Sequence, residues 1–116
     1  MPGQMKEKKT NPMGKKRYGL KTFLDGVRVR ISPSKVILFG SRARGDALAG
    51  SDYDIIIVSE KLRGVPFTAR MTELFRLWDL ATDVDFLCYT PEEFDRKRTQ
   101  IGIVKDAVLH GKTLIG

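Results

Sequence analysis

The chain has a single cysteine, Cys88, so no disulfide can form within it. It also has no apolar run near the roughly 18 residues that a helix needs to span a bilayer. The basic N-terminus is not followed by the apolar segment and small-residue cleavage site of a secretory signal. These absences argue against a disulfide-stapled, membrane-spanning or secreted protein. We therefore expect a soluble protein of the reducing cytoplasm that makes no use of a membrane.

Positive charge is concentrated at the N-terminus. The formal net charge is +7, and residues 1–17 contribute +5 of it, because Glu7 is opposed by six basic residues: Lys6, Lys8, Lys9, Lys15, Lys16 and Arg17. Such a cluster can bind RNA, DNA or an acidic partner, because clustered Lys and Arg neutralise phosphates without reading sequence. The favoured interpretation is a solvated, disordered tail, because the stretch contains two prolines, two glycines and no aromatic residue. We expect a basic tail over residues 1–17 and one folded domain over 18–116.

The spacing of apolar residues predicts alternating helices and strands. A helix is expected over about 17–30, and short apolar runs predict strands over 35–40, 52–58 and 84–89, with a short edge strand over 112–115. Further helices are expected after Pro66, after the capping box Thr90-Pro91-Glu92-Glu93, and over 101–110. We assign the apolar stripe of the helix after Pro66 to the core; its members are Phe67, Met71, Leu74, Phe75 and Trp78. The alternation predicts an α/β (α+β) fold in which helices pack on a small mixed sheet.

Three aspartates occupy strand positions, where acids need an explanation. Asp52 and Asp54 lie two residues apart and so point to one face of their strand, whereas Tyr53 points away. Asp85 lies within the next apolar strand and is preferred to Asp83, which stands at the strand entry. If these strands pair, three carboxylates meet and repel one another unless a cation neutralises them. Oxygen ligands without His or Cys favour Mg²⁺ or Mn²⁺, and two such ions are expected here.

A Gly-Ser turn precedes the acids by ten residues. Gly40 allows the backbone to approach a phosphate closely, and Ser41 offers a hydroxyl at the start of a short helix expected between residues 41 and 51. Arg42 and Arg44 could neutralise phosphate charge. The alternative for these two arginines is a solvated turn in which Arg44 pairs with Asp46.

Three segments contain these residues: Gly40-Ser41-Arg42-Ala43-Arg44-Gly45-Asp46, Ser51-Asp52-Tyr53-Asp54 and Val84-Asp85-Phe86-Leu87. Together they resemble the MNT-type members of the DNA polymerase β nucleotidyltransferase superfamily. The resemblance covers roughly residues 34–90. It implies the nucleotidyltransferase fold, with Asp52, Asp54 and Asp85 as catalytic metal ligands and Gly40 and Ser41 holding the β and γ phosphates. It also implies a donor such as ATP, whose α-phosphate is attacked with loss of pyrophosphate.

The same resemblance suggests a partner. Small stand-alone chains of this type often accompany a helical HEPN protein, to which the MNT chain attaches AMP as the antitoxin of a toxin-antitoxin pair. Two alternatives stay open: a non-catalytic nucleotide-binding module that neutralises a partner ribonuclease by contact, and a transferase that acts on RNA or a small molecule.

Overall fold

The computed structural model describes residues 12–45 and 52–116, and for residues 12–18 it describes the backbone only. A four-stranded mixed sheet forms its centre, in the order β4-β3-β2-β5. The strands are β2 (Lys35–Phe39), β3 (Tyr53–Val58), β4 (Val84–Tyr89) and β5 (Lys112–Ile115). β3 pairs with β4 in parallel, whereas β2 pairs antiparallel with both β3 and β5. The predicted mixed sheet is therefore confirmed, including the short edge strand.

The helices are α1 (Pro12–Ile31), α2 (Ser41–Arg44), α3 (Arg70–Leu77), α4 (Pro91–Lys97) and α5 (Ile103–His110). Two short 3₁₀ turns, η2 (Glu60–Leu62) and η3 (Phe67–Ala69), connect β3 to α3. None of the described helices is long and apolar enough to cross a membrane. The capping box predicted at the start of α4 is confirmed, because the Thr90 hydroxyl accepts from Glu93 N–H and the Glu93 carboxylate accepts from Thr90 N–H.

Helix α1 begins earlier than expected, so the predicted tail boundary at residue 17 falls inside it. Proline suits the first turn of a helix because its missing N–H would have no partner there, and Pro12 is the first residue of α1. Residues 1–11 of the basic tail lie outside the described residues.

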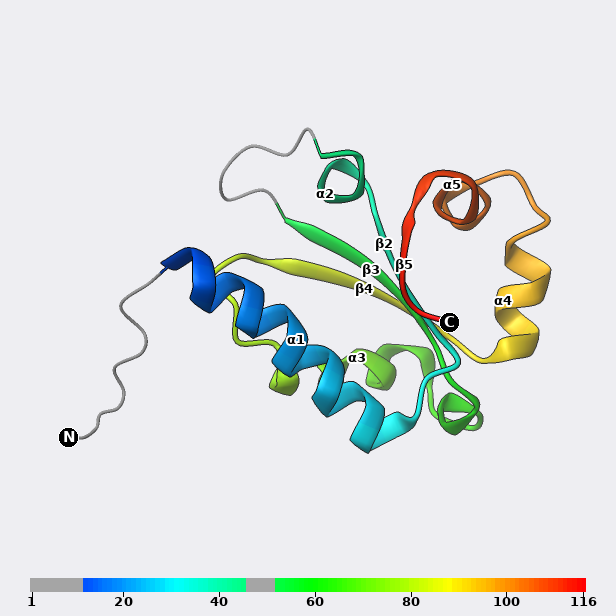
Figure 1. Ribbon diagram of the computed structural model, residues 1–116. Coiled ribbons are helices and arrows are strands. Elements are labelled where there is room, and N and C mark those ends of the chain that lie inside the picture. The colour runs from blue at the N-terminus through cyan, green and yellow to red at the C-terminus, as the bar shows by residue number, and fades with distance from the viewer. Residues whose placement is uncertain (1–11, 46–51) are drawn as a thin grey trace.

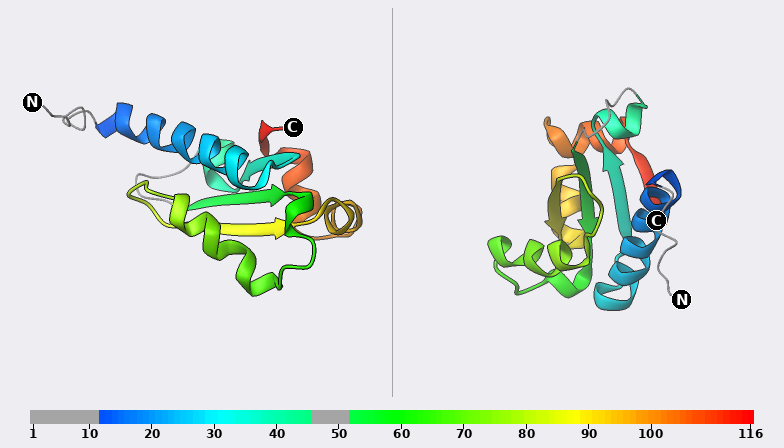
Figure 2. Two further views of the ribbon diagram at one scale, coloured as in Figure 1. Left: turned by 90° about the horizontal axis from the view of Figure 1, so that it is seen from below. Right: turned by 90° about the vertical axis from the view of Figure 1, so that its left-hand side faces the viewer.

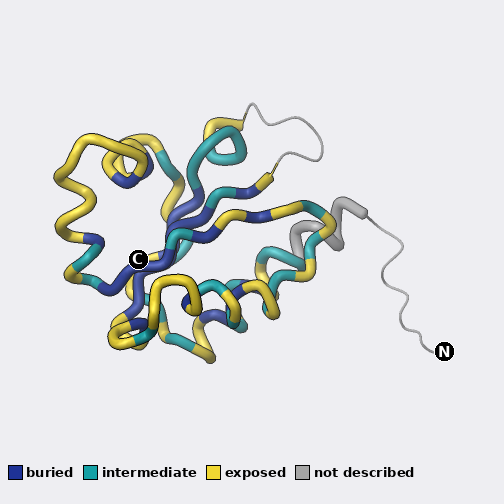
Figure 3. Tube along the Cα trace, turned by 180° about the vertical axis from the view of Figure 1, so that it is seen from behind, coloured by how far each residue is buried: buried dark blue, intermediate teal, exposed yellow. Residues whose placement is uncertain are grey.

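The two faces of the sheet bury separate apolar clusters. Different helices cover the two faces (Figures 1 and 2). One face packs against α1 and α3, around Phe23, Ile55 and Phe86. The other packs against α4 and α5, through Ile56, Phe94 and Val104 among others. Strand β3 and most of β2 and β4 are buried, whereas β5 and much of the described helices are exposed or half-buried (Figure 3). Both faces of β3 are covered, as its nearly continuous apolar sequence predicts.

The apolar stripe after Pro66 is only partly core. Leu74 is buried, but Phe67 and Phe75 are 48% and 47% exposed. Phe67 is exposed because the segment starts as the 3₁₀ turn η3 and becomes α-helical only at Arg70, so Phe67 does not continue the buried face of α3. Phe75 lies within α3 but only at the edge of the core, where its ring packs against Phe86 with centroids 5.2 Å apart. The assignment of Phe67 and Phe75 to the core is thus wrong.

A buried arginine ties three elements together. Arg70 is 7% exposed and donates to the Val65 carbonyl, to the Cys88 carbonyl of β4 and to both carboxylate oxygens of Glu93 on α4. The Arg70 side-chain hydrogen bond, together with the Thr90 N–H, lowers the pKa of Glu93 from its ordinary value of 4.5 to about 2. The start of α3, the end of β4 and the start of α4 are therefore held as one unit.

We expect Glu93→Gln to lower the free energy of unfolding at pH 7 by roughly 1–3 kcal/mol, the usual worth of hydrogen bonds to charged groups. Because the folded-state pKa of Glu93 lies below its ordinary value, the stabilisation is full above about pH 4.5 and is lost as the pH falls towards 2. Urea unfolding of both proteins between pH 7 and pH 3 measures the difference. Glu92→Gln is the control, since among the described residues the exposed Glu92 forms an ion pair with Arg63 alone; an equal loss in both variants would contradict the role of Glu93.

Candidate active site

The sheet register places two of the three predicted acids side by side. Asp54 on β3 is the direct partner of Asp85 on β4. In parallel strands such partners lie about 4.8 Å apart at the backbone and point to the same face. The competitor Asp83 lies before β4, and its carbonyl accepts from Tyr53 N–H. The preference for Asp85 over Asp83 thus agrees with the geometry of the sheet.

The three carboxylates of Asp52, Asp54 and Asp85 repel one another. Partial burial raises the pKa of Asp54, and the negative charges of Asp85 and Asp52 raise it further. Asp52 and Asp85 are themselves exposed, so the three acids form an open patch at one end of the sheet. A cation bound at this patch would be stabilised by the three carboxylates, because it would relieve their mutual repulsion.

The described residues contain no group of three or more His, Cys, Asp or Glu side chains that could by itself hold a metal ion. Metal binding by Asp52, Asp54 and Asp85 stays a prediction. Magnesium sites are commonly built from one or two carboxylates completed by substrate phosphates and water. The Asp54–Asp85 pair, with Asp52 nearby, fits that type of site.

Gly40 adjoins the acid patch from the end of β2. Its backbone has φ +75° and ψ −157°, a conformation available essentially to glycine alone. A Cβ atom added to Gly40 would lie 2.5 Å from Oδ2 of Asp54. Glycine is therefore required twice, for the backbone turn and for the close approach to the carboxylate.

Ser41 opens the short helix α2, whose first turn is closed by bonds from Ala43 and Arg44 N–H to the Gly40 carbonyl. The helix confirms the expected short helix after the Gly-Ser turn, and it lies at the same end of the sheet as the starts of β3 and β4 (Figure 1). Gly40, Ser41 and Asp54 are therefore brought together from two neighbouring strands.

The two arginines of α2 differ in their surroundings. The Arg42 guanidinium carbon lies 4.4 Å from the centroid of the Tyr53 ring, which belongs to the buried cluster on the opposite face from Asp54. Arg44 is exposed at the end of α2. The alternative pairing of Arg44 with Asp46 falls on a residue outside the described ranges. Phosphate binding by Arg42 and Arg44 stays a prediction.

Sequence reasoning missed the Arg42–Tyr53 contact and the buried Arg70–Glu93 pair. A signal for the second was present, because Arg70 stands three residues after Phe67 and four before Leu74. A charged residue at apolar helical spacing indicates a buried cation that needs a partner. The partner could not be identified without the fold, since Glu93 already had a role in the capping box.

We expect Gly40→Ala to displace the Asp54 carboxylate, because the new methyl group occupies its place. Gly102→Ala is the matched control: Gly102 has a similar backbone conformation, with φ 149° and ψ −167°, but no atom lies near its added Cβ. Each variant should lose about 1–3 kcal/mol of stability from backbone strain. Only Gly40→Ala should shift the carboxyl ¹³C signals of Asp54 and Asp85 in NMR spectra; equal shifts in both variants would contradict the contact.

In metal-free buffer, Asp54→Asn should raise the free energy of unfolding by roughly 0.2–1 kcal/mol, the scale of cross-strand side-chain pairs. The reason is that the substitution removes one of two like charges in register. Urea unfolding in the presence of EDTA measures the change, with Asp106→Asn on the surface of α5 as control. A less stable Asp54→Asn protein would show that the acids do not repel in the folded state.

Comparisons with known proteins agree with this geometry. Residues 20–81, more than half of the chain, match the family described as nucleotidyltransferase domain, a span that includes Gly40, Ser41, Asp52 and Asp54 but not Asp85. No curated protein matches the sequence. A crystal structure of a protein from Sulfolobus solfataricus, assigned as a nucleotidyltransferase, aligns with 28% identity and a TM-score of 0.55 over 83% of this chain and 85% of that one.

Two plant structures share the fold alone. BolA1 from Arabidopsis thaliana has 14% identity and a TM-score of 0.51, covering 63% of this chain and 92% of its own. The BolA domain of SufE1 from the same plant has 13% identity and a TM-score of 0.50, covering 66% and 94%. The family match and the more similar Sulfolobus structure point the same way, and this chain belongs to the nucleotidyltransferase domain family.

Proposed function

We propose that the protein transfers AMP from ATP to a hydroxyl group, with release of pyrophosphate. The observation that carries the proposal is the register pairing of Asp54 with Asp85 beside the Gly40 turn. Asp52, Asp54 and Asp85 would hold Mg²⁺, for which Mn²⁺ could substitute. When bound there, the metal would supply charge neutralisation of the phosphates and polarisation of the α-phosphate.

The chain's own residues would bind the phosphates and remove the proton of the acceptor. The bare backbone at Gly40 and the hydroxyl of Ser41 would bind the β and γ phosphates, with Arg42 and Arg44 near them to offset negative charge. Asp85 lies on β4, on the side of Asp54 away from β2 and Gly40. An acceptor hydroxyl approaching from β4 would meet Asp85 first, and its carboxylate can take the hydroxyl proton during attack.

We infer that the acceptor hydroxyl belongs to a tyrosine of a separate helical protein of the HEPN type. The chain would then act as the antitoxin of a toxin-antitoxin pair. Exposed apolar side chains at and just before α5 support contact with another protein: Ile101, Ile103 and Leu109 are 97%, 61% and 65% exposed. A cytoplasmic location fits the supply of ATP and the lone, buried thiol of Cys88. RNA contact through the basic tail stays a further proposal.

Replacing Asp54 by Ala should remove the gain in ATP affinity that Mg²⁺ confers on the native protein. The reason is loss of a hard oxygen ligand from the patch that the metal neutralises. Calorimetric titration with ATP, with and without Mg²⁺, measures this. The control is Asp83→Asn, whose metal response should match that of the native chain; an undiminished metal effect in Asp54→Ala would count against the site.

Asp85→Asn should reduce AMP transfer at least a hundredfold, the lower range for loss of a general base, while keeping most of the ATP affinity. The test incubates the chain with its helical partner and ATP and measures the mass of the partner. Addition of one or more AMP groups by the native chain, but not by Asp85→Asn, is the expected result. A partner that is inhibited on mixing yet keeps its mass would replace the transferase proposal by a contact-neutralising module.

A further inference from the structure

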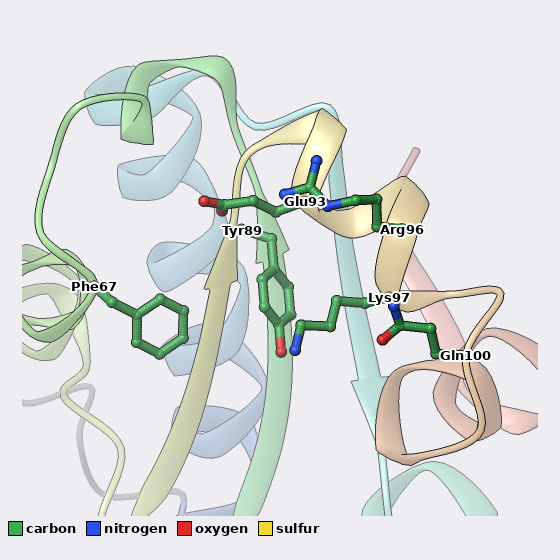
Figure 4. A pocket seen from close by; sticks show the side chains of 6 residues that line it. All are labelled: Phe67, Tyr89, Glu93, Arg96, Lys97 and Gln100. Carbon is green, nitrogen blue, oxygen red and sulfur yellow. The ribbon is translucent and has the colours of Figure 1, made fainter.

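A second concave site lies at the far end of β4 from the acids. It is a cavity of about 450 Å³ between η3, the end of β4 and α4, lined by Phe67, Tyr89, Glu93, Arg96, Lys97 and Gln100 (Figure 4). Its size falls within the range of small-ligand pockets. None of its lining residues belongs to the Gly40–Asp85 site.

Two aromatic rings form the apolar part of this cavity. Phe67 and Tyr89 form a tilted pair, with their ring centroids 6.1 Å apart and their planes inclined by 46°. Phe67 is nearly half exposed, whereas Tyr89 is buried in the floor of the site. An exposed ring opposite a fixed one offers a stacking surface for a planar group.

The aromatic wall is held in place from behind. The Arg70 guanidinium carbon lies 5.5 Å from the centroid of the Phe67 ring. Arg70 is itself fixed by its bonds to Glu93 and to the Val65 and Cys88 carbonyls. A buried, fully bonded arginine therefore supports Phe67, so a ligand would meet a preformed surface.

Positive charge surrounds the opening. Arg96 and Lys97 are exposed on α4 and make no ion pair with any described residue. The one carboxylate in the lining, Glu93, is engaged by Arg70. Gln100 adds an amide that can both donate and accept. Stacking rings, free cations and an amide together suit a base that carries a phosphate better than they suit a purely acidic group.

We propose that this cavity binds a nucleotide unit, with its base stacked on the exposed ring of Phe67 above the buried Tyr89 and its phosphate bound by Arg96 and Lys97. The unit is either a free nucleotide or part of an RNA chain. Tyr89 lies four residues from Asp85 on the same face of β4, about 13 Å along the strand. Of the three strands that carry the active site, β4 is the edge strand and lies farthest from Gly40. The cavity thus lies on the side from which the acceptor approaches Asp85. This assignment to the acceptor side rests on the proposed function, whereas the proposed binding of a nucleotide unit does not depend on it.

The test titrates the full chain with AMP in EDTA and maps binding by NMR and calorimetry. Phe67→Leu and Lys97→Ala should each raise the Kd for AMP about tenfold, as expected for loss of a stacking ring or a phosphate contact. The matched controls are Phe75→Leu, an equally exposed phenylalanine on α3, and Lys105→Ala, an exposed lysine on α5. Both controls should change the Kd less than twofold.

Two further probes identify the source of the ligand. Tighter binding of tetra-adenylate RNA than of AMP supports an RNA chain, and equal affinity supports a free nucleotide. Displacement of AMP by polyglutamate at equal charge would overturn the proposal in favour of an acidic peptide site.

An unchanged Kd in Phe67→Leu and Lys97→Ala would also overturn the proposal. So would loss of AMP binding in Asp54→Ala, since the probe would then occupy the donor site. Failure of the transferase proposal has a different signature, namely a metal effect on ATP binding that Asp54→Ala leaves intact.

Discussion

The parallel pairing of β3 with β4 is the constraint on which the site depends. It sets Asp54 beside Asp85 at a spacing that their charges oppose, and the packing of Ile55, Ile56 and Ile57 on both faces of the sheet holds the strands in that register. A shift of one residue would move Asp85 to the other face and bury it against α1 and α3. The apolar core thus holds together two charges that would otherwise separate, and the stored repulsion favours a cation.

The opposite end of β4 is organised by an attraction. Arg70 joins β4 to α3 and α4, and the same contacts support Phe67 at the edge of a cavity. One strand therefore carries an open acidic group at its start and a cationic, aromatic site at its end. In the proposed function these are the chemical centre and the surface that receives a second molecule.

Much of the fold and of the candidate site was predictable from the sequence, because strands, helix starts and the Gly-Ser turn depend on local sequence patterns. Short apolar runs predicted the strands, Thr90 and Glu93 predicted the start of α4, and the spacing of Gly40 and Asp54 predicted the turn beside the acid. The exposure of Phe67 was not predictable, because it results from a 3₁₀ turn at a position where continued α-helical spacing places the residue on the buried face. The cavity likewise joins residues of η3, β4 and α4 that only the tertiary fold brings together.

In the proposed function, the acid patch and the Gly40 turn form one site that binds the metal and the nucleotide together. Paramagnetic broadening by Mn²⁺ in the amide NMR spectrum tests it most directly, because the effect falls off steeply with distance from the ion. With ATP present, signals of residues 40–43, 53–55 and 84–86 should broaden at low Mn²⁺ concentration while those of Phe94 and its neighbours on α4 persist. Broadening that is centred on α4, or that is equal throughout the chain, would contradict the account.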